Sequence, residues 1–127
     1  MIHLLSPTGF GSKIDFAVDT MVALGNLIAT IKRRQRIERV RLLDVPCGDM
    51  TWMRRFLESR DDVDYTGIDI VPELIAAHKS SFGATTWKFE HRDIITDGLP
   101  VGQTYNLILC RSAGLSCALF TIGAILF

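Results

Sequence analysis

The sequence predicts an α/β fold in which helices flank a parallel sheet. Short apolar runs that are typical of buried strands alternate with longer segments whose apolar residues recur at helical spacing. Strands that alternate with helices pair in parallel through right-handed crossovers. The chain has 127 residues, of which 48% are apolar and 22% are charged. These values indicate one small globular domain and exclude a disordered chain.

Three amphipathic helices are expected. The first begins at about Lys13 and keeps one apolar stripe along its length. The second has Asp49 as its N-cap and ends near Arg60. The third opens with Pro72, a residue that suits the first helical position, and ends at Gly83, because glycine is common where helices stop.

Four strands are expected between segments that contain breakers of regular structure. Segment 1–12 contains Pro7 and two glycines, which predicts a loose segment without regular structure before the first helix. Segment 97–100 (Asp-Gly-Leu-Pro) predicts a loop. The expected strands are Val40–Val45, Val63–Ile70, Thr85–Phe89 and Tyr105–Cys110.

The charge balance argues against a nucleic-acid partner. The 14 Lys and Arg residues equal the 14 Asp and Glu residues, whereas proteins that bind nucleic acid are typically basic. Six cations gather between Lys32 and Arg41. They predict either a phosphate-binding patch or cations placed near a helix C-terminus. The second interpretation is favoured, because no aromatic residues that could stack on bases lie between the cations.

The cysteines and histidines predict neither a disulfide framework nor a metal site. The cysteines are odd in number and form no C-x-x-C pair. The histidines lack the spacing of metal ligands. The chain does not open with a basic segment followed by a long apolar run, so we expect a reducing, cytoplasmic location. The cysteines are Cys47, Cys110 and Cys117.

The residues best suited to chemistry stand at the strand ends, because ligands of open α/β sheets bind outside the carboxyl ends of the strands. After the first strand, Asp44-Val-Pro46-Cys47-Gly48 predicts a tight turn before a helix N-terminus, whose N–H groups attract electron-rich ligands. Gly48 allows a ligand to approach the backbone, and the carboxylate of Asp44 could attract a cationic group. Cys47 is expected to pack or to line the ligand rather than to act as a nucleophile.

Three further strand ends complete the expected site. Asp69 follows Gly48 by 21 residues, close to the spacing at which a carboxylate binds ribose hydroxyls. Asp93 and Ile94 suit the edge and the face of an adenine, and Cys110 would lie at the floor. Asp69 and Asp93 could each be only a capping acid. Their joint spacing favours a nucleotide site.

Segment 40–111 resembles the nucleotide-binding half of the class I S-adenosylmethionine-dependent methyltransferases. In that family the first strand ends in an acidic-x-Gly-x-Gly-x-Gly loop. Asp44 stands at the acidic position and Gly48 at the middle glycine, whereas Pro46 and Met50 replace the outer glycines. The form Asp-Val-Pro-Cys-Gly-Asp resembles a sub-group of bacterial-type methyltransferase domains.

The resemblance implies a Rossmann-like sheet, incomplete at about four strands with flanking helices, and S-adenosylmethionine as the cofactor. It also implies that Asp69 binds the ribose, that Asp93 contacts the adenine amino group, and that Cys110 lies near the methionine moiety. It implies neither a methyl acceptor nor catalytic residues. The expected cofactor-binding residues are Asp44, Pro46, Cys47, Gly48, Asp69, Ile70, Asp93, Ile94 and Cys110.

Three segments are expected: an N-terminal helical segment (1–39), the cofactor-binding half (40–111) and an apolar tail (112–127). Members of the family continue to seven strands, so we expect a truncated chain that is inactive alone. The tail contains no charged residue. It predicts either the product of truncation or a segment that pairs as an edge strand, docks on a partner or touches a membrane.

Other functions stay open beside the methyltransferase. One is a non-catalytic remnant of the same fold that depends on a partner. Another is a nicotinamide-dinucleotide oxidoreductase, which is disfavoured because the G-x-G-x-x-G turn is absent. A third is a membrane-associated protein, which is disfavoured because the tail is shorter than the roughly 20 apolar residues that span a bilayer.

Overall fold

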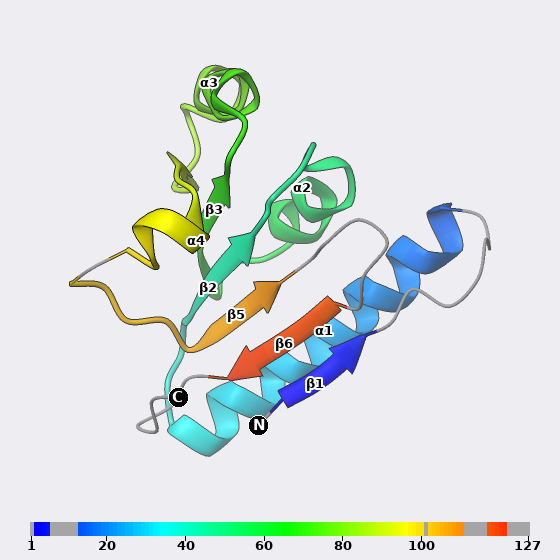
Figure 1. Cartoon of the computed structure of the whole chain (residues 1–127). Coiled ribbons are helices and arrows are strands. Elements are labelled where there is room, and N and C mark those ends of the chain that lie inside the picture. Colours follow the sequence, from blue (N-terminus) through cyan, green and yellow to red (C-terminus); the bar gives the residue numbers. More distant parts are fainter. Residues whose placement is uncertain (1, 6–12, 101, 111–116, 122–127) are drawn as a thin grey trace.

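The structure is a computed structural model, and it describes residues 2–5, 13–100, 102–110 and 117–121. The described residues form one six-stranded sheet of order β1-β6-β5-β2-β3-β4, with helices beside it (Figure 1). In chain order the elements are β1 (Ile2–Leu5), α1 (Lys13–Gln35), β2 (Val40–Val45), α2 (Thr51–Glu58), β3 (Val63–Asp69), α3 (Pro72–Ser81), β4 (Lys88–His91), α4 (Ile94–Asp97), β5 (Leu107–Cys110) and β6 (Cys117–Thr121).

The middle of the sheet is the predicted parallel unit. β5, β2, β3 and β4 are neighbours in that order, and each pair is parallel. The chain therefore runs outward from β2 to β4 and then returns to β5 on the other side of β2. This reversal makes a switch point at the carboxyl ends of β2 and β5, where sheets of this kind bind ligands. The prediction of a Rossmann-like parallel sheet of four strands with flanking helices is confirmed.

Two antiparallel strands extend this sheet beyond the prediction. β6 pairs with β5, and β1 pairs with β6. The prediction of a loose segment is wrong for Ile2–Leu5, because the backbone groups of these residues pair with a strand near the other end of the chain. The tail pairs as a strand over Cys117–Thr121, so the edge of β5 is covered. The other residues of segments 1–12 and 112–127 lie outside the described residues.

At two of the element ends that differ from the prediction, local hydrogen bonds compete with regular structure. Thr85 closes a turn instead of opening a strand, since its N–H and its hydroxyl both donate to the carbonyl of Phe82, at 3.0 and 2.7 Å. Asp49 is not the N-cap of α2. Met50 takes that place with a φ of 66°, and the side chain of Asp49 accepts instead from the N–H of Thr51 at 2.9 Å.

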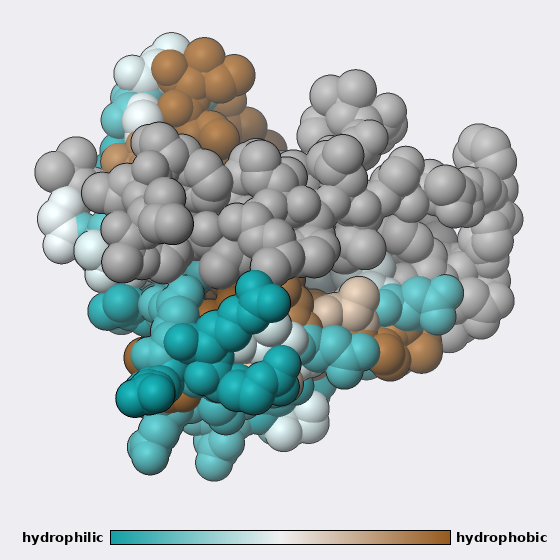
Figure 2. Space-filling view, turned by 90° about the horizontal axis from the view of Figure 1, so that it is seen from below, coloured by the Kyte–Doolittle hydropathy of each residue, from teal (hydrophilic) through white to brown (hydrophobic). Residues whose placement is uncertain are grey.

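The basic run lies where the helix dipole favours it. Figure 2 views the molecule from the side on which α1 ends in Figure 1, and hydrophilic side chains gather there. Lys32 pairs with Asp62 at 3.0 Å, and Arg39 pairs with Asp64. The interpretation as cations near a helix C-terminus is confirmed for the three that lie in the last turn of α1, whereas Arg41 lies in β2. The last turn of α1 contains Lys32, Arg33 and Arg34.

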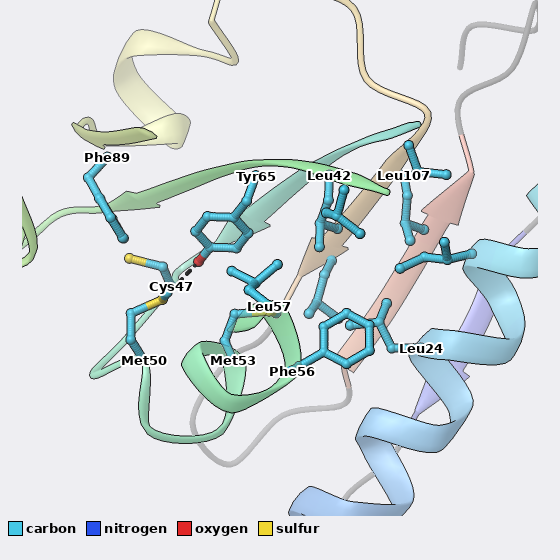
Figure 3. Packing of buried hydrophobic residues seen from close by; sticks show 14 of the residues in the cluster. Leu24, Leu42, Cys47, Met50, Met53, Phe56, Leu57, Tyr65, Phe89 and Leu107 are labelled. Carbon is cyan, nitrogen blue, oxygen red and sulfur yellow. Dashed lines mark hydrogen bonds between the residues drawn. The ribbon is translucent and has the colours of Figure 1, made fainter. Parts of the chain in front are cut away.

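The larger buried cluster joins the sheet to helices α1, α2 and α3. Leu24 of α1 and Phe56 of α2 approach Leu42 and Leu107 of the central strands (Figure 3). Burial of this apolar surface supplies most of the stabilisation, at about 25 cal/mol per Å². A smaller cluster lies on the other face of the sheet. It comprises Leu43, Val45, Ile68, Tyr105 and Ile108.

Gly67 in β3 is packed too tightly for any side chain. A Cβ at this position would lie 2.8 Å from the hydroxyl oxygen of Tyr65 and 2.9 Å from the Cβ of Cys47, and both of these residues are buried. We expect Gly67→Ala to destabilise the fold by about 1–3 kcal/mol, the usual cost of overpacking. Urea unfolding checks this. Gly25→Ala in α1 is the control and is expected not to lower stability, because alanine favours a helix interior. Equal stabilities of the Gly67→Ala and wild-type chains would contradict the packing described.

Asp62 makes stability depend on pH. Side-chain hydrogen bonds from Arg60 lower the pKa of Asp62 from 3.8 to about 2; Lys32 adds to this effect, and partial burial opposes it. Because the folded-state pKa lies below the unfolded value, the ion pairs stabilise the fold above about pH 4, and this contribution falls as the pH drops from about 4 to 2. We expect Asp62→Asn to flatten the decline in unfolding free energy over that range, whereas Asp61→Asn should not. Parallel declines for wild type and Asp62→Asn would contradict the assignment.

Candidate functional site

A cavity of about 340 Å³ lies where the carboxyl ends of β2, β3, β4 and β5 meet. It therefore occupies the switch point at which the sequence places the site. Each of the four parallel strands contributes residues from its end or from the turn that follows. The lining residues are Val45, Pro46, Ile68, Asp69, Ile70, Arg92, Asp93, Ile94, Ile95 and Cys110.

Asp69 ends β3 and joins two backbone segments at the cavity. Its side chain is among the lining residues, although the residue is only 6% exposed. Oδ2 accepts from the N–H of Gly48 at 3.1 Å, and Oδ1 accepts from the N–H of Val71 at 3.1 Å. Each carboxylate oxygen can accept two hydrogen bonds, so both oxygens retain capacity for a ligand. Asp69 can therefore orient the turn after β2 and bind a hydroxyl group at the same time.

Gly48 adopts a backbone conformation that favours glycine. Its φ is +61°, in the left-handed region. A Cβ built on Gly48 would meet no other heavy atom within 4 Å, so the space beside this backbone is open. The N–H of Gly48 is held by Asp69, and its carbonyl oxygen lies 2.7 Å from Nε2 of His78. The loop thus offers an accessible backbone that is held at both its N–H and its C=O.

Asp93 has the capping role that the sequence left open, and it also lines the cavity. It is the N-cap of α4, and its Oδ1 accepts from the N–H of Ile95 at 2.9 Å. The cap directs the chain into one short helical turn, which places Ile94 and Ile95 beside the cavity. Ile95 is 91% exposed. The turn therefore combines a carboxylate with apolar surface, as binding a heterocyclic base would require.

Arg92 stabilises this wall of the cavity through hydrogen bonds. Its guanidinium donates to Oε1 of Glu90 at 2.9 and 3.0 Å, and to the carbonyls of Asp97 and Gly98 at 3.2 and 3.4 Å. Its backbone N–H donates to the carbonyl of Asp69 at 3.1 Å. Arg92 therefore ties both ends of the turn around α4 to the sheet.

Asp44 and Cys47 lie beneath the loop rather than at the cavity wall. Side chains alternate along a strand, so Asp44 points to the opposite face from Val45, which lines the cavity. Asp44 is 0% exposed and accepts from the hydroxyl of Tyr65 at 2.8 Å. Cys47 is also 0% exposed, and its N–H donates to the carbonyl of Ile68 at 2.9 Å. Figure 3 shows the Tyr65 ring directed toward Cys47.

Most of the predicted site residues meet at the cavity, but not all of them. Pro46, Asp69, Ile70, Asp93, Ile94 and Cys110 line it, and Gly48 adjoins it through Asp69. Asp44 and Cys47 are fully buried and do not line the cavity. The sequence prediction missed Val45, Ile68, Arg92 and Ile95. The sequence feature that could have indicated these four residues is their position, because each lies next to a predicted site residue.

A second cavity, of about 430 Å³, lies away from these strand ends. Arg41, Thr66 and Lys88 contribute to its wall, together with Tyr105 from the segment before β5. Burial raises the pKa of Tyr105 above 10.0, and a hydrogen bond with Thr66 opposes that effect. Within the described residues, no group of three or more His, Cys, Asp and Glu side chains is arranged to hold a metal ion.

Comparison with known proteins identifies one related fold. No protein-family model matches the chain, and no curated protein matches it. The structure is similar to the crystal structure of the plantazolicin methyltransferase BpumL in complex with a triazolic desmethylPZN analog and SAH, with a TM-score of 0.51 and 23% sequence identity. The match covers 66% of this chain and 31% of BpumL, so the chain spans less than a third of that enzyme.

The fold is the property that this similarity establishes. Among the described helices, none combines the length and the apolar character that crossing a bilayer requires. The parallel strands, the switch-point cavity and the match to BpumL agree with the resemblance seen in the sequence. The described part of the chain has a Rossmann-like fold similar to that of the methyltransferase BpumL over the matched residues.

Proposed function

We propose that the chain is an S-adenosylmethionine-dependent methyltransferase domain and that segment 40–111 binds the cofactor. Segments 1–39 and 112–127 would flank this half. The observation that supports the proposal most strongly is the convergence of Asp69, Asp93 and the Gly48 loop around one cavity. The cavity volume of about 340 Å³ lies within the range of about 300–1,000 Å³ that is usual for small-molecule sites.

The residues present fit this cofactor. The two oxygens of Asp69 retain acceptor capacity for the two ribose hydroxyls. Ile70 and Ile94 offer apolar surface to an adenine, and Asp93 offers a carboxylate to its amino group. The open space beside Gly48 allows the methionine portion to approach the backbone. BpumL, whose fold is similar, was crystallised with SAH, the demethylated form of the same cofactor.

The chemistry needs little from the protein beyond binding. The cofactor supplies a methyl group that its positive sulfur already activates. The protein would then contribute orientation and the exclusion of water, and a base only where the acceptor requires one. For this reason the cofactor-binding residues do not identify the acceptor or a catalytic residue.

The charge balance and the cysteine pattern support a proposal for the partner and the location. We propose that the ligand is the small-molecule cofactor, without nucleic acid, and that the protein is cytoplasmic. The balanced charge and the salt bridges of Lys32 and Arg39 support the first part. The cysteine pattern of the sequence, an odd number with no C-x-x-C pair, supports the second.

Isothermal calorimetry tests the proposed cofactor. The purified chain is titrated with S-adenosylmethionine, S-adenosylhomocysteine and NAD. We expect saturable binding of the first two and none of NAD, because the turn after β2 has one glycine where a dinucleotide turn needs three. Binding of NAD alone would make the oxidoreductase alternative correct.

A further inference from the structure

His78 connects helix α3 to the turn that holds Gly48. It lies in the last turn of α3 and is 5% exposed. Its Nε2 is 2.7 Å from the carbonyl oxygen of Gly48, which is a hydrogen bond of good length. A carbonyl can only accept, so Nε2 carries the proton and donates. This is a long-range contact, because the two residues are 30 positions apart in the sequence.

The ring of His78 also packs against aromatic neighbours. Its centroid lies 5.0 Å from that of Phe89 in β4 and 5.8 Å from that of Phe82, the C-cap of α3. An apolar side chain would pack against these rings without the cost of burying a polar group. The imidazole therefore has a use that packing alone does not explain. Within the described part of the chain, that use is the hydrogen bond to Gly48.

A short hydrogen-bond network links His78 to the cavity through Gly48 and Asp69. His78 donates to the C=O of Gly48, the N–H of Gly48 donates to Oδ2 of Asp69, and Oδ1 of Asp69 accepts from Val71. Val71 immediately precedes α3, the helix that carries His78, so the network closes on itself. The conformation of Gly48, with its φ of +61°, is fixed from both sides by these bonds.

We propose that His78 is a positioning residue for cofactor binding, which rests on the proposed function. It does not touch the cavity and is not a catalytic residue. By holding the Gly48 carbonyl, it keeps the loop in the conformation that leaves its backbone open to the ligand and keeps the Gly48 N–H aimed at Asp69. The orientation of the Asp69 carboxylate is therefore set before the ligand arrives.

The test compares three variants of the full chain. His78→Gln keeps an N–H donor at the same number of bonds from Cβ, and His78→Leu removes the donor but stays apolar. Phe82→Leu is the matched control, because it disturbs the ring packing of His78 but not the bond to Gly48. For each variant, calorimetry gives the affinity for S-adenosylhomocysteine, NMR gives the exchange rate of the Gly48 amide without ligand, and urea unfolding gives stability.

We expect His78→Leu to speed exchange of the Gly48 amide and to weaken binding about three- to tenfold, the loss expected from one net hydrogen bond. His78→Gln should restore both values toward wild type. Phe82→Leu should lower stability while leaving both values near wild type. Equal effects of Gln and Leu, or no effect of Leu, would overturn the proposal.

A wild-type chain that binds no S-adenosylhomocysteine would overturn the proposed function and the role of His78 in cofactor binding. Exchange of the Gly48 amide would then still decide whether His78 holds the loop. Faster exchange in His78→Leu alone would keep that structural role. Unchanged exchange would remove it as well.

Discussion

Asp69→Ala is expected to weaken S-adenosylmethionine binding by about 1.5–3 kcal/mol, or roughly 10- to 150-fold. The carboxylate accepts from the N–H groups of Gly48 and Val71 and retains acceptor capacity for the ribose. Its removal would take away the proposed ligand contacts and the restraint on the Gly48 turn together. The dissociation constant from calorimetry measures the effect.

Asp62→Ala is the control for this prediction. Asp62 is also a partly buried acid with several hydrogen bonds, but its partners are Lys32 and Arg60, and it does not line the cavity. Asp62→Ala should lower stability and leave affinity unchanged for the protein that remains folded. Equal affinities of the two variants would show that Asp69 does not bind the ligand.

Gly48→Val is expected to abolish cofactor binding while the helical content stays similar. A β-branched residue at a φ of +61° is strained by about 1–2 kcal/mol, and its side chain would enter the open space beside the loop. Both effects act on the same segment of backbone. Calorimetry and far-ultraviolet circular dichroism measure binding and helix content on the same sample.

The matched control for this variant is Gly102→Val. Gly102 also has a positive φ, of +81°, and open space at its Cβ, but it lines the second cavity. It should carry a similar backbone strain and leave cofactor affinity intact. If Gly48→Val bound the cofactor normally, the turn after β2 would not be part of the binding site.

The strand ends were predictable because they depend on local sequence and a general rule of topology. Asp69 lies near the end of one predicted strand and Asp93 comes shortly after another, and parallel strands bring their carboxyl ends to one edge. This rule about strand ends does not predict on which face of the sheet a given side chain lies. Asp44 looked equivalent to Asp69, but strand alternation places it against Tyr65 in the core.

Contacts between distant segments were beyond sequence reasoning. Ile2–Leu5 becomes strand β1 only because β6 supplies its partner, and neither short segment has a strong pattern of its own. His78 sits on an otherwise ordinary helix, and nothing in its sequence neighbourhood indicates a bond to Gly48. The short helix α4 was not predicted although its signal is local. Asp93 alone, interpreted as a ligand or a capping acid, does not indicate that a helix follows it.

An NMR titration of the isotope-labelled chain with S-adenosylhomocysteine tests the central claim most directly. The account predicts that the largest amide shifts occur at Gly48, Ile70, Ile95 and Cys110, around the cavity at the strand ends, while Gln103 and Thr104 of the second cavity stay unchanged. Shifts confined to the second cavity, or no shifts at saturating ligand, would contradict it.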